Sequence, residues 1–342
     1  RGLKELGVGT SVVCQPLSPL SIKLKKANIQ TFEINMRCEA DAIASWKISE
    51  EVRKGKFDII HMHDSHSHWL GACASFISGR PHKVVSRRVD FSIKRHGFGL
   101  SVLKYKYFAD TYITVSEAVR KALLHDGIPQ DRIHNVYSGV EMQKQNKNKI
   151  ELKRLLRVGE NEIIIGAVGS LVWHKGYEIL IYAAASVVKR FPDVRFVIFG
   201  DGPLYNSLTE LINKLQLSEK VILTGFIEEA QDYISALDVY VSSSIMEGLG
   251  TSLLDALVFS KPVAASAAGG IPEIIENNKT GLLVPVGSPE ALAEAICSLI
   301  SNSTLSRILG EAGRELVKER FSAEKMVEST LNIYAGLMRN SK

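Results

Sequence analysis

The 342-residue sequence is poor in cysteine and has no long apolar run. Its four cysteines, Cys14, Cys38, Cys73 and Cys297, lie far apart, without the spacing of a disulfide framework or a zinc site. We therefore expect reduced thiols in a cytoplasmic protein. No apolar stretch approaches the roughly 20 residues that span a bilayer, which argues against a transmembrane helix.

Two common motifs of nucleotide-binding enzymes are also missing. The sequence has no Gly-x-Gly-x-x-Gly fingerprint, which argues against a dinucleotide cofactor. Residues 151–342 contain no Asp-x-Asp pair. We therefore expect neither a required divalent metal nor another cofactor.

The net charge of +5 conceals a difference between the two halves. Residues 1–150 hold 24 Lys and Arg against 14 Asp and Glu, a net +10, whereas residues 151–342 hold 18 against 23, a net −5. A basic first half suits anionic lipid headgroups, a phosphorylated partner or ordinary solvation. Aromatic residues do not alternate with the basic ones, so we expect no nucleic-acid partner.

Short apolar, β-branched runs alternate with helical patterns along the whole chain. Such alternation is typical of parallel sheets covered by helices, and a chain of this length favours two domains. We predict an α/β fold with two Rossmann-like domains facing a central cleft. The predicted parts are residues 1–145, residues 146–320 and a C-terminal helical segment, 321–342, that can cross back to the first domain. The expected strands are 10–14, 57–61, 83–86, 111–115 and 134–137, then 163–169, 195–200, 221–224, 239–242, 262–265 and 281–284.

The first seven residues resemble the end of a helix. Arg1–Gly7 ends at a glycine, directly before the expected strand over residues 10–14. A helix that enters a parallel sheet needs a preceding strand, so we expect that one strand and a helix start are missing before residue 1. A genuine start on a short helix is the alternative.

A glycine-rich segment follows the expected strand over residues 239–242 and leads into a helix. Gly248 and Gly250 allow the backbone to approach a ligand closely, and Thr251 or Ser252 can cap the helix. The N–H groups at a helix start favour anions such as a diphosphate. A capped helix without a ligand is the simpler alternative.

Two carboxylates, Glu247 and Asp255, flank this segment. A carboxylate accepts two hydrogen bonds simultaneously, which suits the neighbouring hydroxyls of a hexose or a ribose. The loop over residues 169–176 follows another strand and carries Lys175 into a helix. An ammonium group suits a leaving phosphate. Together the two loops predict a site for a sugar linked to a diphosphate.

In their order, the motifs resemble glycosyltransferase family 4, retaining enzymes with the GT-B fold. The matching segments are Val115–Ser116, Val136–Val140, Gly169–Gly176, Gly200–Pro203, Thr224–Phe226, Ala236–Val239, Glu247–Ser252, Ala268–Glu273 and Thr280–Val284. The likeness covers nearly the whole chain and is strongest in its second half. The ordered set is specific, although each motif alone is common.

The resemblance implies roles for single residues. Lys175 would hold the diphosphate of a nucleotide sugar and Glu247 would contact the transferred sugar, which makes both candidate catalytic residues. Asp255 would contact the ribose, and Phe226 would lie beside the nucleobase. The donor-binding candidates are Ser170, Phe226, Gly248, Leu249, Gly250, Thr251, Ser252 and Asp255.

Three departures from the family pattern concern the site. Asp255 stands where the family has the longer Glu, and Ser170 stands where it often has Arg. A family histidine usually follows the strand resembling residues 83–86, whereas this chain has Arg87 and Arg88 there. Either arginine can bind a phosphate or an acidic acceptor, so both are acceptor-side candidates.

Four histidines and an aspartate lie within residues 61–68. Zinc binding is one interpretation, but alternate residues of an extended segment face opposite sides, and no second ligand cluster is evident. We therefore predict no metal site. His63 and Asp64, at the carboxyl end of a strand, are instead expected to line the acceptor side.

The sequence, together with the resemblance, thus predicts a metal-independent hexosyltransferase that uses a UDP- or GDP-type donor, and the resemblance implies that it is retaining. Its acceptor is a glycan, a lipid or a small molecule, and the basic first half favours a lipid-linked or anionic one. The same charge favours peripheral contact with the inner membrane face. A non-catalytic nucleotide-sugar-binding module, and an epimerase or phosphorylase of the same fold, stay open as alternatives.

Overall fold

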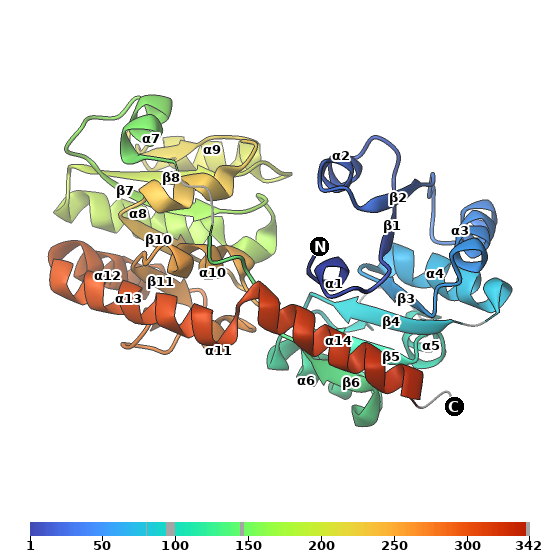
Figure 1. Cartoon of the computed structure of the whole chain (residues 1–342). Helices are drawn as coiled ribbons and strands as arrows, with labels where there is room; N and C mark the ends of the chain where they lie inside the picture. Colours follow the sequence, from blue (N-terminus) through green and yellow to red (C-terminus); the bar gives the residue numbers. More distant parts are fainter. Residues whose placement is uncertain (80, 94–99, 144–146, 340–342) are drawn as a thin grey trace. The chain divides into compact units, whose positions relative to one another are not determined.

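The computed structural model describes residues 1–79, 81–93, 100–143 and 147–339. The chain divides into two compact units, Arg1–Tyr137 with Ala323–Lys342, and Ser138–Ser322. Each unit contains parallel strands accompanied by helices, which confirms the predicted α/β class (Figure 1). No helix in the described part of the chain is both long and apolar enough to cross a membrane.

The second unit is built on six parallel strands in the order β12-β11-β10-β7-β8-β9. The strands are β7 Ile163–Val168, β8 Val194–Phe199, β9 Val221–Leu223, β10 Val239–Ser242, β11 Val263–Ser266 and β12 Leu282–Val284. The helices are α7 Lys149–Leu156, α8 Tyr177–Arg190, α9 Tyr205–Lys214, α10 Thr251–Val258, α11 Ile271–Ile274, α12 Pro289–Ser301 and α13 Ser303–Arg320. Two 3-10 helices, η3 Trp173–Lys175 and η4 Ala230–Ala236, complete this unit.

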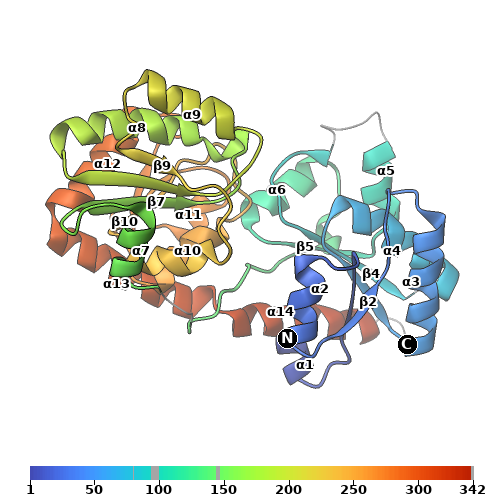
Figure 2. The same cartoon turned by 90° about the horizontal axis from the view of Figure 1, so that it is seen from above.

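Helices cover both faces of this sheet. In Figure 2, α8, α9 and α12 lie on one side of the strands, and α7, α10 and α13 lie on the other. Strands covered on both faces need nearly continuous apolar sequences. β7 and β8 meet that need, because Ile164, Ile165, Phe196 and Ile198 are all at most 1% exposed.

The first unit contains two parallel sheets, β1-β2 and β3-β4-β5-β6. The strands are β1 Ser11–Cys14, β2 Gln30–Glu33, β3 Ile59–Met62, β4 His82–Arg87, β5 Thr111–Thr114 and β6 Ile133–Asn135. The helices are α1 Gly2–Glu5, α2 Pro19–Lys26, α3 Ala42–Gly55, α4 Ser65–Ser78, α5 Leu100–Tyr107, α6 Glu117–His125 and α14 Ala323–Arg339, with the 3-10 turn η2 Gln130–Arg132.

The C-terminal helix α14 is part of the first unit, although it follows the second unit in the chain. It crosses the four-stranded sheet in Figure 1. Its residues Ile333, Tyr334 and Leu337 pack against Val84 and Ile113 of the sheet. The amphipathic pattern of α14 thus buries one face of β4 and β5.

Candidate active site

The strand order of the second unit reverses between its two central strands. From β7 the chain continues to β8 and β9 on one side, whereas β10, β11 and β12 extend the sheet on the other. In open parallel sheets, ligands bind beyond the carboxyl ends of the strands at such a reversal. The loops that follow β7 and β10 are therefore the expected place for a ligand, and they carry Lys175 and Glu247.

These two loops are hydrogen-bonded to each other. The Ser243 hydroxyl donates to the Lys175 carbonyl over 3.0 Å, and the Ile245 N–H donates to the His174 carbonyl over 2.8 Å. Gly176 has φ +63°, and a Cβ added there would lie 2.2 Å from the Ser243 carbonyl oxygen. Only glycine fits this contact, which fixes the helix start behind Lys175 against the second loop.

The side chains of Lys175 and Glu247 meet where the loops do. Lys175 Nζ lies 2.6 Å from Glu247 Oε2, and the Ser244 hydroxyl donates to the same oxygen over 3.1 Å. The two side chains are 22% and 15% exposed. The ammonium and the carboxylate are therefore largely enclosed but still open to a ligand.

The Gly-Asp-Gly-Pro turn after β8 supports the Lys175 loop. A Cβ on Gly200 would lie 1.9 Å from the Gly169 carbonyl oxygen, and one on Gly202 would lie 2.7 Å from that of Leu171. The Leu171 N–H donates to the Asp201 carbonyl over 2.9 Å. These glycines allow two backbones to approach closely, which is a structural role.

The prediction that Thr251 or Ser252 caps α10 is wrong. The capping residue is Gly250 at φ +97°, and no side-chain capping bond forms there within the described residues. Thr251 and Ser252 are instead the first two helical residues. The half-buried Ser252 side chain is hydrogen-bonded to the phenol of Tyr240, which is 1% exposed.

The remaining donor-binding candidates differ in exposure. Gly248, Leu249 and Asp255 are buried. Ser170 and Phe226 are exposed, and the Phe226 ring is 79% accessible. Ser170 follows β7 and Phe226 follows β9, so both lie past carboxyl ends of strands in the same sheet.

Two buried tyrosines near the ion pair were not recognised from the sequence. Tyr177 and Tyr240 are 4% and 1% exposed, and burial raises the pKa of both phenols. The Glu247 carboxylate adds to both shifts. Two neutral phenols therefore lie close to Glu247. The apolar pattern of a strand or a helix does not predict that a tyrosine within it lies beside a distant carboxylate.

The acceptor-side candidates lie at the carboxyl ends of β3 and β4 in the first unit. His63 is exposed and stacks on His61, with ring centroids 4.3 Å apart. Asp64 caps α4 by accepting from the Ser67 N–H over 2.7 Å. Both residues therefore lie at the start of α4.

The two arginines at the end of β4 have different surroundings. The Arg87 guanidinium donates to the Tyr105 hydroxyl over 2.9 Å and also to the Phe91 carbonyl. The Arg88 side chain is exposed. Desolvation is the main cause that lowers the pKa of His61 and His63, and the charge of Arg88 lowers both further. Arg88 is thus the arginine that an anionic ligand can reach.

The histidines within residues 61–68 have different surroundings. His68 is fully buried beside Tyr105 and Tyr112, and its Nε2 lies 3.3 Å from the Phe108 carbonyl. Burial, followed by the charge of Lys104, lowers the His68 pKa to about 4. Within the described residues, no three His, Cys, Asp or Glu side chains are placed to hold a metal ion.

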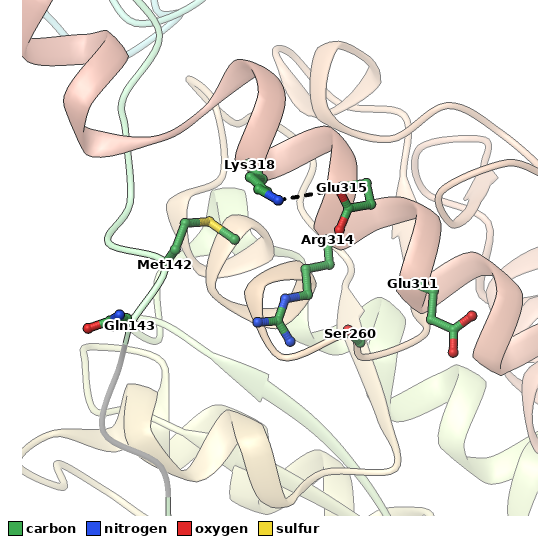
Figure 3. A pocket seen from close by; sticks show the side chains of 7 residues that line it. All are labelled: Met142, Gln143, Ser260, Glu311, Arg314, Glu315 and Lys318. Atoms are coloured by element: carbon green, nitrogen blue, oxygen red, sulfur yellow. Dashed lines mark ion pairs between the residues drawn. The ribbon is translucent and has the colours of Figure 1, made fainter.

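A separate pocket of about 630 Å³ lies between α13 and the segment after β6 (Figure 3). Arg314 extends from α13 into the space between Met142 and Ser260. The lining residues are Met142, Gln143, Ser260, Glu311, Arg314, Glu315 and Lys318. None of them is a predicted site residue.

The chain is similar to known proteins in sequence and in fold. Residues 148–316 match the family described as glycosyl transferases group 1, and residues 1–144 match glycosyltransferase family 4. A Bacillus anthracis relative, N-acetyl-alpha-D-glucosaminyl L-malate synthase, is 26% identical over 88% of this chain and 80% of its own length.

Two further similarities extend over most of the chain. A GDP-mannose-dependent alpha-(1-6)-phosphatidylinositol monomannoside mannosyltransferase of Mycobacterium tuberculosis is 26% identical over 81% of this chain and 78% of its own. The crystal structure of Anabaena HepE with UDP and glucose superposes with a TM-score of 0.86 at 22% identity, over 99% of this chain and 94% of that one. The two family models and the shared fold lead to one conclusion: the chain belongs to glycosyltransferase family 4 and is a glycosyltransferase of the GT-B fold.

Proposed function

We propose that this enzyme transfers a hexosyl group, with retention of configuration, from a nucleoside diphosphate sugar to an anionic acceptor. The observation that carries the proposal is the pairing of Lys175 with Glu247 at the strand-order reversal of the second unit. Lys175 supplies a cation for a diphosphate, and Glu247 supplies two acceptor oxygens for sugar hydroxyls.

The proposed reaction breaks the bond between the anomeric carbon and the diphosphate oxygen. A new bond forms between that carbon and a hydroxyl oxygen of the acceptor, whose proton passes to the departing diphosphate. In this proposal negative charge grows on the leaving oxygen, and Lys175 and the start of α10 stabilise it. A fixed ammonium supports a reaction without a metal or another cofactor.

The names of two similar proteins support a nucleoside diphosphate sugar as the donor. The HepE structure holds UDP and glucose, and the mycobacterial relative is named as GDP-mannose-dependent. Both nucleotides carry a diphosphate, the group that Lys175 suits. Phe226, which is 79% exposed past the end of β9, offers an aromatic face to a nucleobase.

The acceptor class rests on Arg88 and on the same relatives. The name of one relative includes L-malate, a dicarboxylate, and that of another includes phosphatidylinositol, which carries a phosphate. Arg88 and His63 are both exposed at neighbouring strand ends, and a guanidinium can bind a carboxylate or a phosphate through two parallel hydrogen bonds. We expect Arg87 to stabilise the fold instead, because Tyr105 and Phe91 already bind it.

A thermal-shift panel of UDP, GDP and their sugar conjugates tests the donor. A ligand that binds the folded state stabilises it by an amount that increases with the logarithm of its affinity at a fixed concentration, so one nucleotide series should show the larger rise in melting temperature. The selected donor is then incubated with malate, inorganic phosphate and glycerol phosphate, and the anomeric configuration of the product is read by NMR. Binding without turnover of any acceptor would contradict the proposed transfer, and an inverted product would contradict retention.

A further inference from the structure

A polar group of three side chains interrupts the apolar contact between α14 and the sheet of the first unit. His61 Nδ1 lies 2.5 Å from the Tyr334 hydroxyl, and His61 Nε2 lies 2.8 Å from the Ser86 hydroxyl. Tyr334 comes from α14, Ser86 from β4 and His61 from β3. Both ring nitrogens of His61 are thus held, each by a different element.

The surroundings of this group are otherwise apolar. Ile59 lies two residues before His61, and it packs with Val84, Ile113 and Leu337 between the sheet and α14. Burial and the neighbouring charges hold the pKa of His61 well below its usual value, so the ring is neutral. Polar groups in an apolar interface cost stability unless each is bonded, and an aliphatic residue would fill the space without that requirement.

The position of His61 beside His63 suggests a function for this polar group. His61 stacks on His63, with the ring planes 27° apart, and the strand alternation places the two residues on the same face. No hydrogen bond is recorded for the His63 ring among the described residues, and the ring is exposed. The stacked His61 ring is thus one contact that holds the His63 ring in place.

We propose that His61 is a positioning residue for acceptor binding: Ser86 and Tyr334 lock its ring, and the locked ring orients the exposed imidazole of His63. This inference rests on the proposed function, since it gives His63 an acceptor hydroxyl or anion to bind. It assigns to α14 a part in the acceptor site through Tyr334. Neither Tyr334 nor Ser86 contacts the acceptor itself.

The test compares Tyr334→Phe and Ser86→Ala with wild type in the full chain. Each variant removes one hydroxyl that holds His61 and leaves the apolar packing nearly unchanged. Tyr182→Phe is the matched control, because Tyr182 is 47% exposed on α8 in the other unit. The first readout is the NMR chemical shift of the His63 ring protons, which the stacked His61 ring displaces.

We expect the displaced His63 shift to move toward the unstacked value in Tyr334→Phe and Ser86→Ala and to stay unchanged in Tyr182→Phe. With the donor and acceptor that wild type uses, KM for the acceptor should rise roughly fivefold, about the effect of one lost hydrogen bond, while KM for the donor stays constant. An unchanged His63 shift in both variants would overturn the inference. If wild type transfers no sugar, the proposed function fails while the NMR result still decides the positioning of His63.

Discussion

Lys175 Nζ lies 2.6 Å from Glu247 Oε2, although 72 positions separate the two residues in the chain. The ammonium proposed for the diphosphate is thus already neutralised by the carboxylate proposed for the sugar. We expect a donor that binds as proposed to take Lys175 away from Glu247 and to give each group a new partner. The ion pair would then hold both side chains in place until a donor binds.

Replacement of Glu247 by Gln distinguishes its ion pair with Lys175 from its proposed contact with the transferred sugar. The amide keeps the size of the side chain but removes the charge that competes for Lys175, so UDP or GDP alone should bind at least as tightly as to wild type. Transfer should fall roughly 100-fold because the sugar loses a charged partner. Calorimetry measures the first quantity and a nucleotide-release assay the second.

Glu276→Gln is the control for that prediction, since Glu276 forms an exposed ion pair with Lys279 at 3.3 Å. It should alter neither quantity. Weaker binding of the free nucleotide by Glu247→Gln would show that Glu247 holds the nucleotide part of the donor, contrary to the role given to it here.

Two glycines with similar backbone angles differ in their surroundings. Gly176 has φ +63°, and a Cβ added there would lie 2.2 Å from the Ser243 carbonyl oxygen, whereas Gly225 has φ +69° and a Cβ added there would meet nothing within 4 Å. Gly225→Ala should cost about 1 kcal/mol of unfolding free energy for its backbone conformation alone. Gly176→Ala should cost about 1–3 kcal/mol more, because the loops must separate. Urea denaturation of both variants measures the difference, and equal losses would show that the two loops are not in close contact.

Much of the fold could be predicted from the sequence because its strands are continuous apolar runs. The expected strand over residues 239–242 coincides with β10, and that over residues 163–169 differs from β7 by one residue. β2 was not predicted, since Gln30–Glu33 is short and three of its four residues are polar.

The sequence predicts the loops that form the candidate site but not the side-chain contacts within it. The glycines and charged residues after β7 and β10 mark two places in the chain, and parallel strands bring such loops to one edge of a sheet. The sequence gives no sign that Tyr240 is bonded to Ser252, or that Tyr334 reaches His61 across 273 positions. Such contacts depend on side-chain packing between distant segments, which no local pattern encodes.

The buried histidine His68 predicts a loss of stability in mild acid. Its folded-state pKa is about 4, below the ordinary value of 6.5, so between these values the unfolded chain binds the additional proton. The unfolding free energy should therefore decrease as the pH falls from about 6.5 to 4, with His68 contributing up to about 1.4 kcal/mol per pH unit. His68→Gln should reduce this slope, measured by urea denaturation at several pH values. An unchanged slope would mean that His68 titrates alike in the folded and unfolded states.

The central claim is that Lys175 stabilises the departing diphosphate. The most direct measurement compares the rate of nucleoside diphosphate release during sugar transfer in wild type, Lys175→Ala and Lys189→Ala, the last an exposed lysine near the end of α8. We predict that Lys175→Ala slows transfer by roughly 30- to 1,000-fold, about 2–4 kcal/mol, while Lys189→Ala matches wild type. Transfer at the wild-type rate by folded Lys175→Ala would contradict the account.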